Sequence, residues 1–187
     1  MAPNPWSRSF LFPFALGLSL SVWVTPADAA SSISTSDAYL RAVAQHFQLP
    51  LDEVRVLADW NLPLEEVPVV LYVAQRTGVS PDALIAIRRA GTSWMDVARR
   101  YGLDAGIFHT PMESGEAGEL LGDARARFQG VPQSQWSQIQ LSDREVIALV
   151  NVRFLSRELG TGVGQVVEAR SRSRDFVEAY QALLPRR

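Results

Sequence analysis

The sequence has no cysteine, no lysine and only two histidines among its 187 residues. Without cysteine, the chain forms no disulfide and offers neither a thiol nucleophile nor a thiolate metal ligand. The histidines, His46 and His109, are far apart in the sequence, and neither belongs to a spacing such as H-x-x-x-H that would hold zinc. We therefore expect no metal site and no cofactor, and we expect stability to come from burial of apolar side chains alone.

An excess of charge of one sign is also missing. The 18 basic residues, all arginine, nearly balance 20 acidic residues, for a net charge of −2. Proteins that bind nucleic acids normally carry a strongly basic face. We therefore expect no nucleic-acid partner.

The chain also lacks an apolar run long enough for a membrane span, which needs about 20 residues. Its longest such run, over 10–24, follows Arg8 and precedes Ala27-Asp28-Ala29, a small-x-small pattern that signal peptidase reads. We expect 1–29 to be a Sec-type signal peptide cut after Ala29. The mature chain would then be periplasmic or secreted with no stable membrane anchor, and without cysteine it would not be a lipoprotein.

What the sequence does contain is an internal repeat. Residues 43–45, Val-Ala-Gln, recur at 73–75, and a third copy follows at an offset of 82 residues. The third copy pairs Gly78 with Gly160, Leu84 with Val166, Arg88 with Arg170, and Trp94 with Phe176. A period of about thirty residues with apolar positions at helical spacing is typical of repeated helical hairpins.

Helix boundaries follow from proline, serine and acidic residues at the starts and from glycine at the ends. No segment alternates apolar and polar residues as a half-buried strand does. The fold class is therefore all-α, in two lobes of repeated short hairpins: a first lobe over 36–103 and a second over 141–184. Between them, 104–140 should be an irregular linker rich in glycine, proline and acidic residues, with a short helix near 116–128. Expected helices lie at about 36–47, 51–59, 63–77, 81–90, 93–101, 142–159, 163–171 and 174–184.

Motifs for catalysis are absent from the sequence. A serine hydrolase elbow of the type G-x-S-x-G does not occur. Glu65 and Glu66 fall in a first helical turn, so we interpret them as partners of the helix dipole rather than as an acid and a base. His46 lies near a helix end and is expected to be structural. His109, in the linker, has no identifiable partner and is kept as a weak binding candidate. We expect no catalytic residue.

The densest charge cluster is formed by Arg170, Arg172 and Arg174. Arginine forks suit phosphate or carboxylate, so the cluster is a candidate anion site. The alternative is a solvated turn, with Arg170 near the carbonyl end of its own helix. Glu168 and Asp175 flank the cluster and weaken its field.

Three resemblances bear on function. Residues 73–103 resemble helix-turn-helix DNA-binding segments, and 91–103 resembles the helical part of LysM peptidoglycan-binding modules. The chain as a whole resembles exported bacterial α-helical proteins of unknown function, on residues 63–103 in the first half and on 141–143, 151–155, 170–172 and Phe176 in the second. Ser173 departs from that set, in which a glycine is usual. This last resemblance implies an architecture and no activity.

These observations predict a small exported protein that acts by binding and not by catalysis. Stacked helical hairpins present grooves, so a protein or peptide partner is the leading prediction. A cell-wall glycan binder that recognises peptidoglycan is the alternative, and an enzyme of unknown type is the third.

Overall fold

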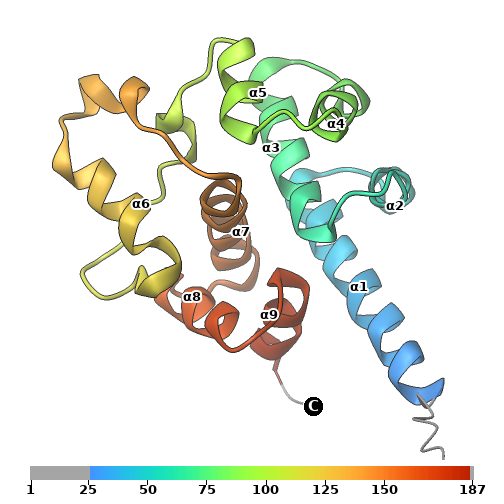
Figure 1. The fold of residues 1–187 in the computed structure, drawn as a ribbon. Coiled ribbons are helices and arrows are strands. Elements are labelled where there is room, and N and C mark those ends of the chain that lie inside the picture. The colour runs from blue at the N-terminus through green and yellow to red at the C-terminus, as the bar shows by residue number, and fades with distance from the viewer. Residues whose placement is uncertain (1–25, 186–187) are drawn as a thin grey trace, which may run out of the picture.

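The computed structural model describes the backbone of residues 26–185 and the side chains of residues 35–185. Over this range every regular element is a helix, so the all-α prediction is confirmed (Figure 1). Most of the expected signal peptide, 1–29, lies outside the described residues. The expected cleavage site at Ala29 falls within the first turn of the first helix.

Nine α-helices and three short 3₁₀ helices, labelled η, make up the described chain. In order they are α1 (Pro26–Phe47), α2 (Leu51–Ala58), η1 (Leu64–Glu66), α3 (Val67–Thr77), α4 (Pro81–Arg89), α5 (Trp94–Arg100), η2 (Ala105–Phe108), α6 (Gly118–Gly130), η3 (Gln133–Gln138), α7 (Asp143–Leu159), α8 (Val163–Ser171) and α9 (Phe176–Leu183).

Two segments differ from what the sequence predicted. The first helix begins at Pro26 rather than near residue 36. Proline is tolerated in a first helical turn, and no further proline or glycine follows until the end of α1, so nothing there interrupts the helix. In residues 104–140, the short helix expected near 116–128 is present as α6, whereas the two 3₁₀ helices η2 and η3 were not predicted.

Local sequence explains where several helices begin and end. The Ser142 hydroxyl accepts the Glu145 amide proton while the Glu145 carboxylate accepts that of Ser142, which is a capping box at the start of α7. Ser93 caps α5 by accepting an amide proton three residues on. Gly78 and Gly160 close α3 and α7 in the left-handed conformation, with φ of 70° and 63°.

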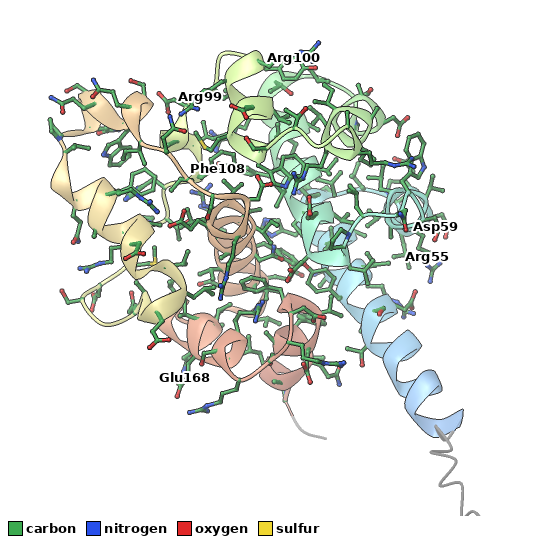
Figure 2. All side chains as sticks on the ribbon, viewed as in Figure 1. Arg55, Asp59, Arg99, Arg100, Phe108 and Glu168 are labelled. Atoms are coloured by element: carbon green, nitrogen blue, oxygen red, sulfur yellow. The ribbon has the colours of Figure 1, made fainter. Side chains whose placement is uncertain are left out.

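The core is built around α7, which lies at the centre of the view with α1, α3, α5, α6, α8 and α9 packed against it (Figure 1). Buried apolar side chains from all nine α-helices form one continuous cluster. Figure 2 shows side chains filling the space between the helices, with the buried Phe108 inside and Arg100 on the outer surface of α5. Helix α3 is buried along most of its length.

Two hydrogen bonds tie the halves of the chain together at helix starts. The Trp94 amide, at the first position of α5, donates to the Asp143 carboxylate on α7 at 2.7 Å. The Phe176 amide, at the first position of α9, donates to the Glu65 carboxylate on η1 at 3.0 Å. In each case, an acid from one half of the chain binds a free amide at a helix start in the other half, where negative charge is stabilising.

Candidate functional site

The three arginines of the 170–174 cluster do not converge on one point. Arg172 pairs with Glu168, four residues earlier, and Arg174 pairs with Glu178. Arg170 turns back to donate to the Ser173 carbonyl at 2.8 Å and lies over the Phe176 ring. Each guanidinium therefore has a local partner within its own turn or helix.

The His109 ring lies in an aromatic cluster. Its centroid is 4.3 Å from that of Trp136 and 5.0 Å from that of Phe128. Burial lowers the pKa of His109, and the nearby Arg153 cation lowers it further. The neutral imidazole of His109 therefore contributes to the packing of α6 against η3. The backbone carbonyl of His109 accepts a hydrogen bond from Arg153.

His46 lies in the last turn of α1, and its Nδ1 atom is 3.5 Å from the Glu158 carboxylate. Burial lowers the pKa of His46, and this effect outweighs the opposing pull of Glu158. The imidazole is therefore neutral at neutral pH, so this contact is not a full ion pair under those conditions.

Glu65 and Glu66 lie in a first helical turn, as expected, and their carboxylates also bind groups on other helices. Glu66 is only 6% exposed and accepts hydrogen bonds from Arg88 Nε at 2.8 Å and from Trp94 Nε1 at 2.9 Å. Arg88 also forms an ion pair with Asp143 at 2.7 Å. These contacts fasten α3, α4, α5 and α7 together, and Glu65 caps α9.

A second buried polar network connects α1 with α7 and the start of α3. The Tyr39 hydroxyl donates to Asn151 Oδ1 at 2.5 Å, and Asn151 Nδ2 donates to the Glu65 and Ile147 carbonyls, each at 2.8 Å. Burial raises the pKa of Tyr39 well above its usual value. Both side chains are fully enclosed and satisfied, so the network positions helices and is closed to a ligand.

One group of side chains combines a tyrosine with three arginines that have no carboxylate partner among the described residues. It comprises Tyr72 and Arg76 on α3 and Arg153 and Arg157 on α7, and we call it the arginine surface. The guanidinium carbons of Arg76 and Arg153 lie 4.9 Å and 5.1 Å from the centre of the Tyr72 ring. Arg76 and Arg157 are exposed, whereas Arg153 and Tyr72 are half-buried.

Neutral acceptors hold the inner part of the arginine surface. Arg153 Nη1 donates to the Tyr72 hydroxyl at 2.5 Å and to the Ile107 carbonyl at 3.0 Å, and its Nη2 donates to the His109 carbonyl. The Tyr72 hydroxyl in turn donates to the Ile107 carbonyl. These bonds fix the Tyr72 ring and Arg153 against η2.

No carboxylate among the described residues pairs with Arg76, Arg153 or Arg157. Burial lowers the pKa of Arg153, and the cations of Arg157 and Arg76 act in the same direction. An arginine nevertheless remains protonated in a protein. The arginine surface is therefore a region of uncompensated positive charge on a protein whose net charge is negative.

Sequence reasoning missed this surface, although a signal was present. Tyr72 and Arg76 are four residues apart, as are Arg153 and Arg157, so each pair shares one helix face. The two pairs fall in the helices expected at 63–77 and 142–159. A tyrosine–arginine pair on one expected helix and an arginine pair on another, each with no acid at i±4 of its arginines, was the available signal.

In comparisons with protein-family models, curated proteins and solved structures, nothing matches this chain. Over residues 26–185, no helix combines the length and apolarity that crossing a membrane requires. The described side chains include no group of three or more histidine, aspartate or glutamate residues placed to hold a metal ion.

Proposed function

We propose that this chain is an exported binding protein without catalytic activity, and that its arginine surface holds an acidic segment of a protein or peptide partner. The observation that carries the proposal is the pair of exposed guanidiniums, Arg76 and Arg157, which flank the fixed Tyr72 ring and Arg153 with no carboxylate partner among the described residues. A carboxylate-bearing segment would supply the missing counter-charge.

The composition of the surface suits a protein partner. Arginine and tyrosine are enriched among the residues that dominate binding energy at protein interfaces. Binding also costs less when side chains are ordered beforehand. Tyr72 and Arg153 are already fixed by hydrogen bonds to η2, so only Arg76 and Arg157 would need to lose side-chain freedom.

We further propose that the repeated hairpin is the unit from which this surface is built. Arg88 lies 5.4 Å from the Trp94 ring centre, and Arg170 lies 5.2 Å from that of Phe176, at the offset of 82 residues seen in the sequence. In both places the preceding long helix, α3 or α7, ends at a glycine in the left-handed conformation. Two lobes derived from such units would bring α3 and α7 together, and these helices carry the arginine surface.

The binding proposal is tested with a fluorescently labelled peptide of glutamate residues, followed by anisotropy at several salt concentrations. A glutamine peptide of the same length serves as the neutral probe. We expect the glutamate peptide alone to bind, with an affinity that falls as salt rises because surface charges are screened. The double variant R76E/R157E should weaken binding roughly tenfold.

A matched control distinguishes this surface from net charge. Arg89 and Arg100 are exposed arginines that likewise have no carboxylate partner among the described residues, so R89E/R100E changes the net charge by the same amount elsewhere. That variant should bind like the wild type. Equal losses in both double variants, or no binding by the wild type at low salt, would refute the proposal.

The other function classes give different results in parallel assays. Sedimentation of the protein with purified peptidoglycan, unaffected by R76E/R157E, would favour a cell-wall glycan binder. Export is tested by mass spectrometry of the protein recovered from the periplasm or medium, for which we expect an N-terminus at Ala30. A full-length chain retained in the cytoplasm would refute export.

A further inference from the structure

A cleft of about 470 Å³ lies between α1, α7 and α9, apart from the arginine surface. Its lining combines apolar side chains, chiefly Ala42, Leu159 and the ring of Tyr180, with the charged groups Arg41, Asp37 and Glu158. This volume lies within the range of about 300–1,000 Å³ that is typical of small-molecule sites.

Glu158 is the unusual member of the lining. Its side chain is only 14% exposed, and the one ion-pair contact that it makes among the described residues is with the His46 imidazole at 3.5 Å. Because that imidazole is neutral at neutral pH, Glu158 has no cationic partner there. A largely buried carboxylate is costly unless it is paired with a cation.

The cation already in the cleft does not supply that charge. Arg41 is exposed, and its guanidinium donates to Asp37 one turn earlier. Asp37 also accepts from Arg55 on α2 at 2.6 Å. Arg55 also pairs with Asp52 at 3.0 Å, so two arginines and two aspartates balance one another in this network, and no ion pair joins any of them to Glu158.

We propose that the cleft binds a small organic ligand through a primary ammonium group, with the Glu158 carboxylate as its counter-ion. Methylene groups of the ligand would pack on Ala42 and Leu159, and the Tyr180 ring would lie beside the cation. The exposed Gln45 amide, which also lines the cleft, adds a further hydrogen-bonding group. This inference does not depend on the arginine surface.

Two ligand chemistries share the ammonium group and differ at the other end. A diamine would place a second cation near Asp37, whereas an amino acid would place a carboxylate near Arg41. Titration calorimetry of the purified protein with cadaverine and with 6-aminohexanoate separates them, and hexanoate serves as the probe without an ammonium group. Binding of either amine supports the proposal and identifies the second group, and hexanoate should not bind.

Two variants with a control connect the binding to the cleft. E158Q should weaken amine binding roughly tenfold, because it keeps the shape and removes the charge. Ala38, a half-buried residue of the same lining, can be enlarged by A38L, which should abolish binding by filling the cleft while Glu158 stays intact. The exposed Glu53 has no partner among the described residues, and E53Q should leave binding unchanged.

Thermal melting of each variant confirms that it is folded before titration. The proposal is overturned if neither amine binds the wild type at millimolar concentration, or if a folded E158Q binds as tightly as the wild type. Binding that A38L leaves unchanged would also overturn it, because the ligand would then lie outside the cleft.

Discussion

Removal of the Glu66 carboxylate tests the internal organisation of the fold most directly. Glu66→Ala takes away the acceptor for Arg88 Nε at 2.8 Å and for the Trp94 indole N–H at 2.9 Å. Trp94 is completely buried, so its indole N–H would have no water to bond instead. Arg88 would keep Asp143 at 2.7 Å and the Thr92 carbonyl at 3.0 Å.

The size of the effect follows from these contacts. Breaking a buried ion pair by removing one partner typically costs about 3–5 kcal/mol. Arg88 retains a second carboxylate, which reduces that part of the loss. The unpaired indole N–H adds about 1–3 kcal/mol. We therefore expect the free energy of unfolding to fall by about 3 kcal/mol, a large fraction of the roughly 5–15 kcal/mol typical of a domain.

The measurement is equilibrium unfolding in urea, followed by tryptophan fluorescence and circular dichroism. The midpoint should fall while the m-value stays constant, because the variant loses stability without changing the surface that unfolding exposes. A double-mutant cycle with Trp94→Phe isolates the indole contact, and it should yield a coupling energy of about 1 kcal/mol or more. Glu53→Ala, on the surface of α2, is the control and should stay within about 0.5 kcal/mol of the wild type.

The reasoning is refuted if Glu66→Ala unfolds at the same urea concentration as Glu53→Ala. It is also refuted if the cycle with Trp94→Phe gives no coupling, because the 2.9 Å contact would then contribute nothing to stability. Glu66→Gln is informative in either case. It keeps an acceptor for one donor but removes the charge, so we expect it to fall between the wild type and Glu66→Ala.

Three further predictions concern stability. Asn151→Leu should cost about 2–3 kcal/mol in urea unfolding, because it leaves a buried tyrosine hydroxyl unpaired, and a loss below 0.5 kcal/mol would contradict the network. The free energy of unfolding should fall as pH drops below about 6.5, the unfolded value of histidine, because burial lowers the pKa values of His46 and His109 and the unfolded chain binds protons first. The double variant H46Q/H109Q should flatten that part of the pH profile, and an unchanged slope would refute the assignment. Gly160→Ala should destabilise the protein by about 1 kcal/mol, because φ is 63° at that position. Gly122→Ala, in the interior of α6 with open space around it, should instead stabilise the protein by about 0.5–1 kcal/mol. Calorimetric melting of the two variants distinguishes these outcomes.

Helix positions could be predicted because their signals are local. The capping box at Ser142 and the left-handed glycine at Gly160 involve residues within a few positions of one another, so the sequence alone identifies them. Helix α8 has the predicted bounds. The extension of α1 back to Pro26 was not predicted, because the residues before 36 are mostly small. They therefore show no large apolar side chains at the spacing that identifies a helix.

The polar contacts that define the site could not be predicted in the same way. Glu66 lies 22 residues from Arg88 in sequence, and Tyr72 lies 81 residues from Arg153. Such pairs depend on how helices pack, and no periodicity encodes them. The arginines at 170–174 were predicted as a candidate anion site because they are close in sequence. In the structure, each binds a partner within its own turn or helix. In the arginine surface, Arg76 is far in sequence from Arg153 and Arg157, and none of the three pairs with a carboxylate among the described residues.

The reciprocal caps at Trp94 and Phe176 bear on whether the two halves can fold apart. A fragment that ends near residue 103 would lose the Asp143 carboxylate that binds the Trp94 amide, and it would also expose the face of α3 that packs on α7. The second half would likewise lose Glu65 from the start of α9. Since each half supplies a helix cap and part of the shared core to the other, we expect a single cooperative unfolding transition. The arginine surface, built from α3 and α7 together, would be lost in that same transition.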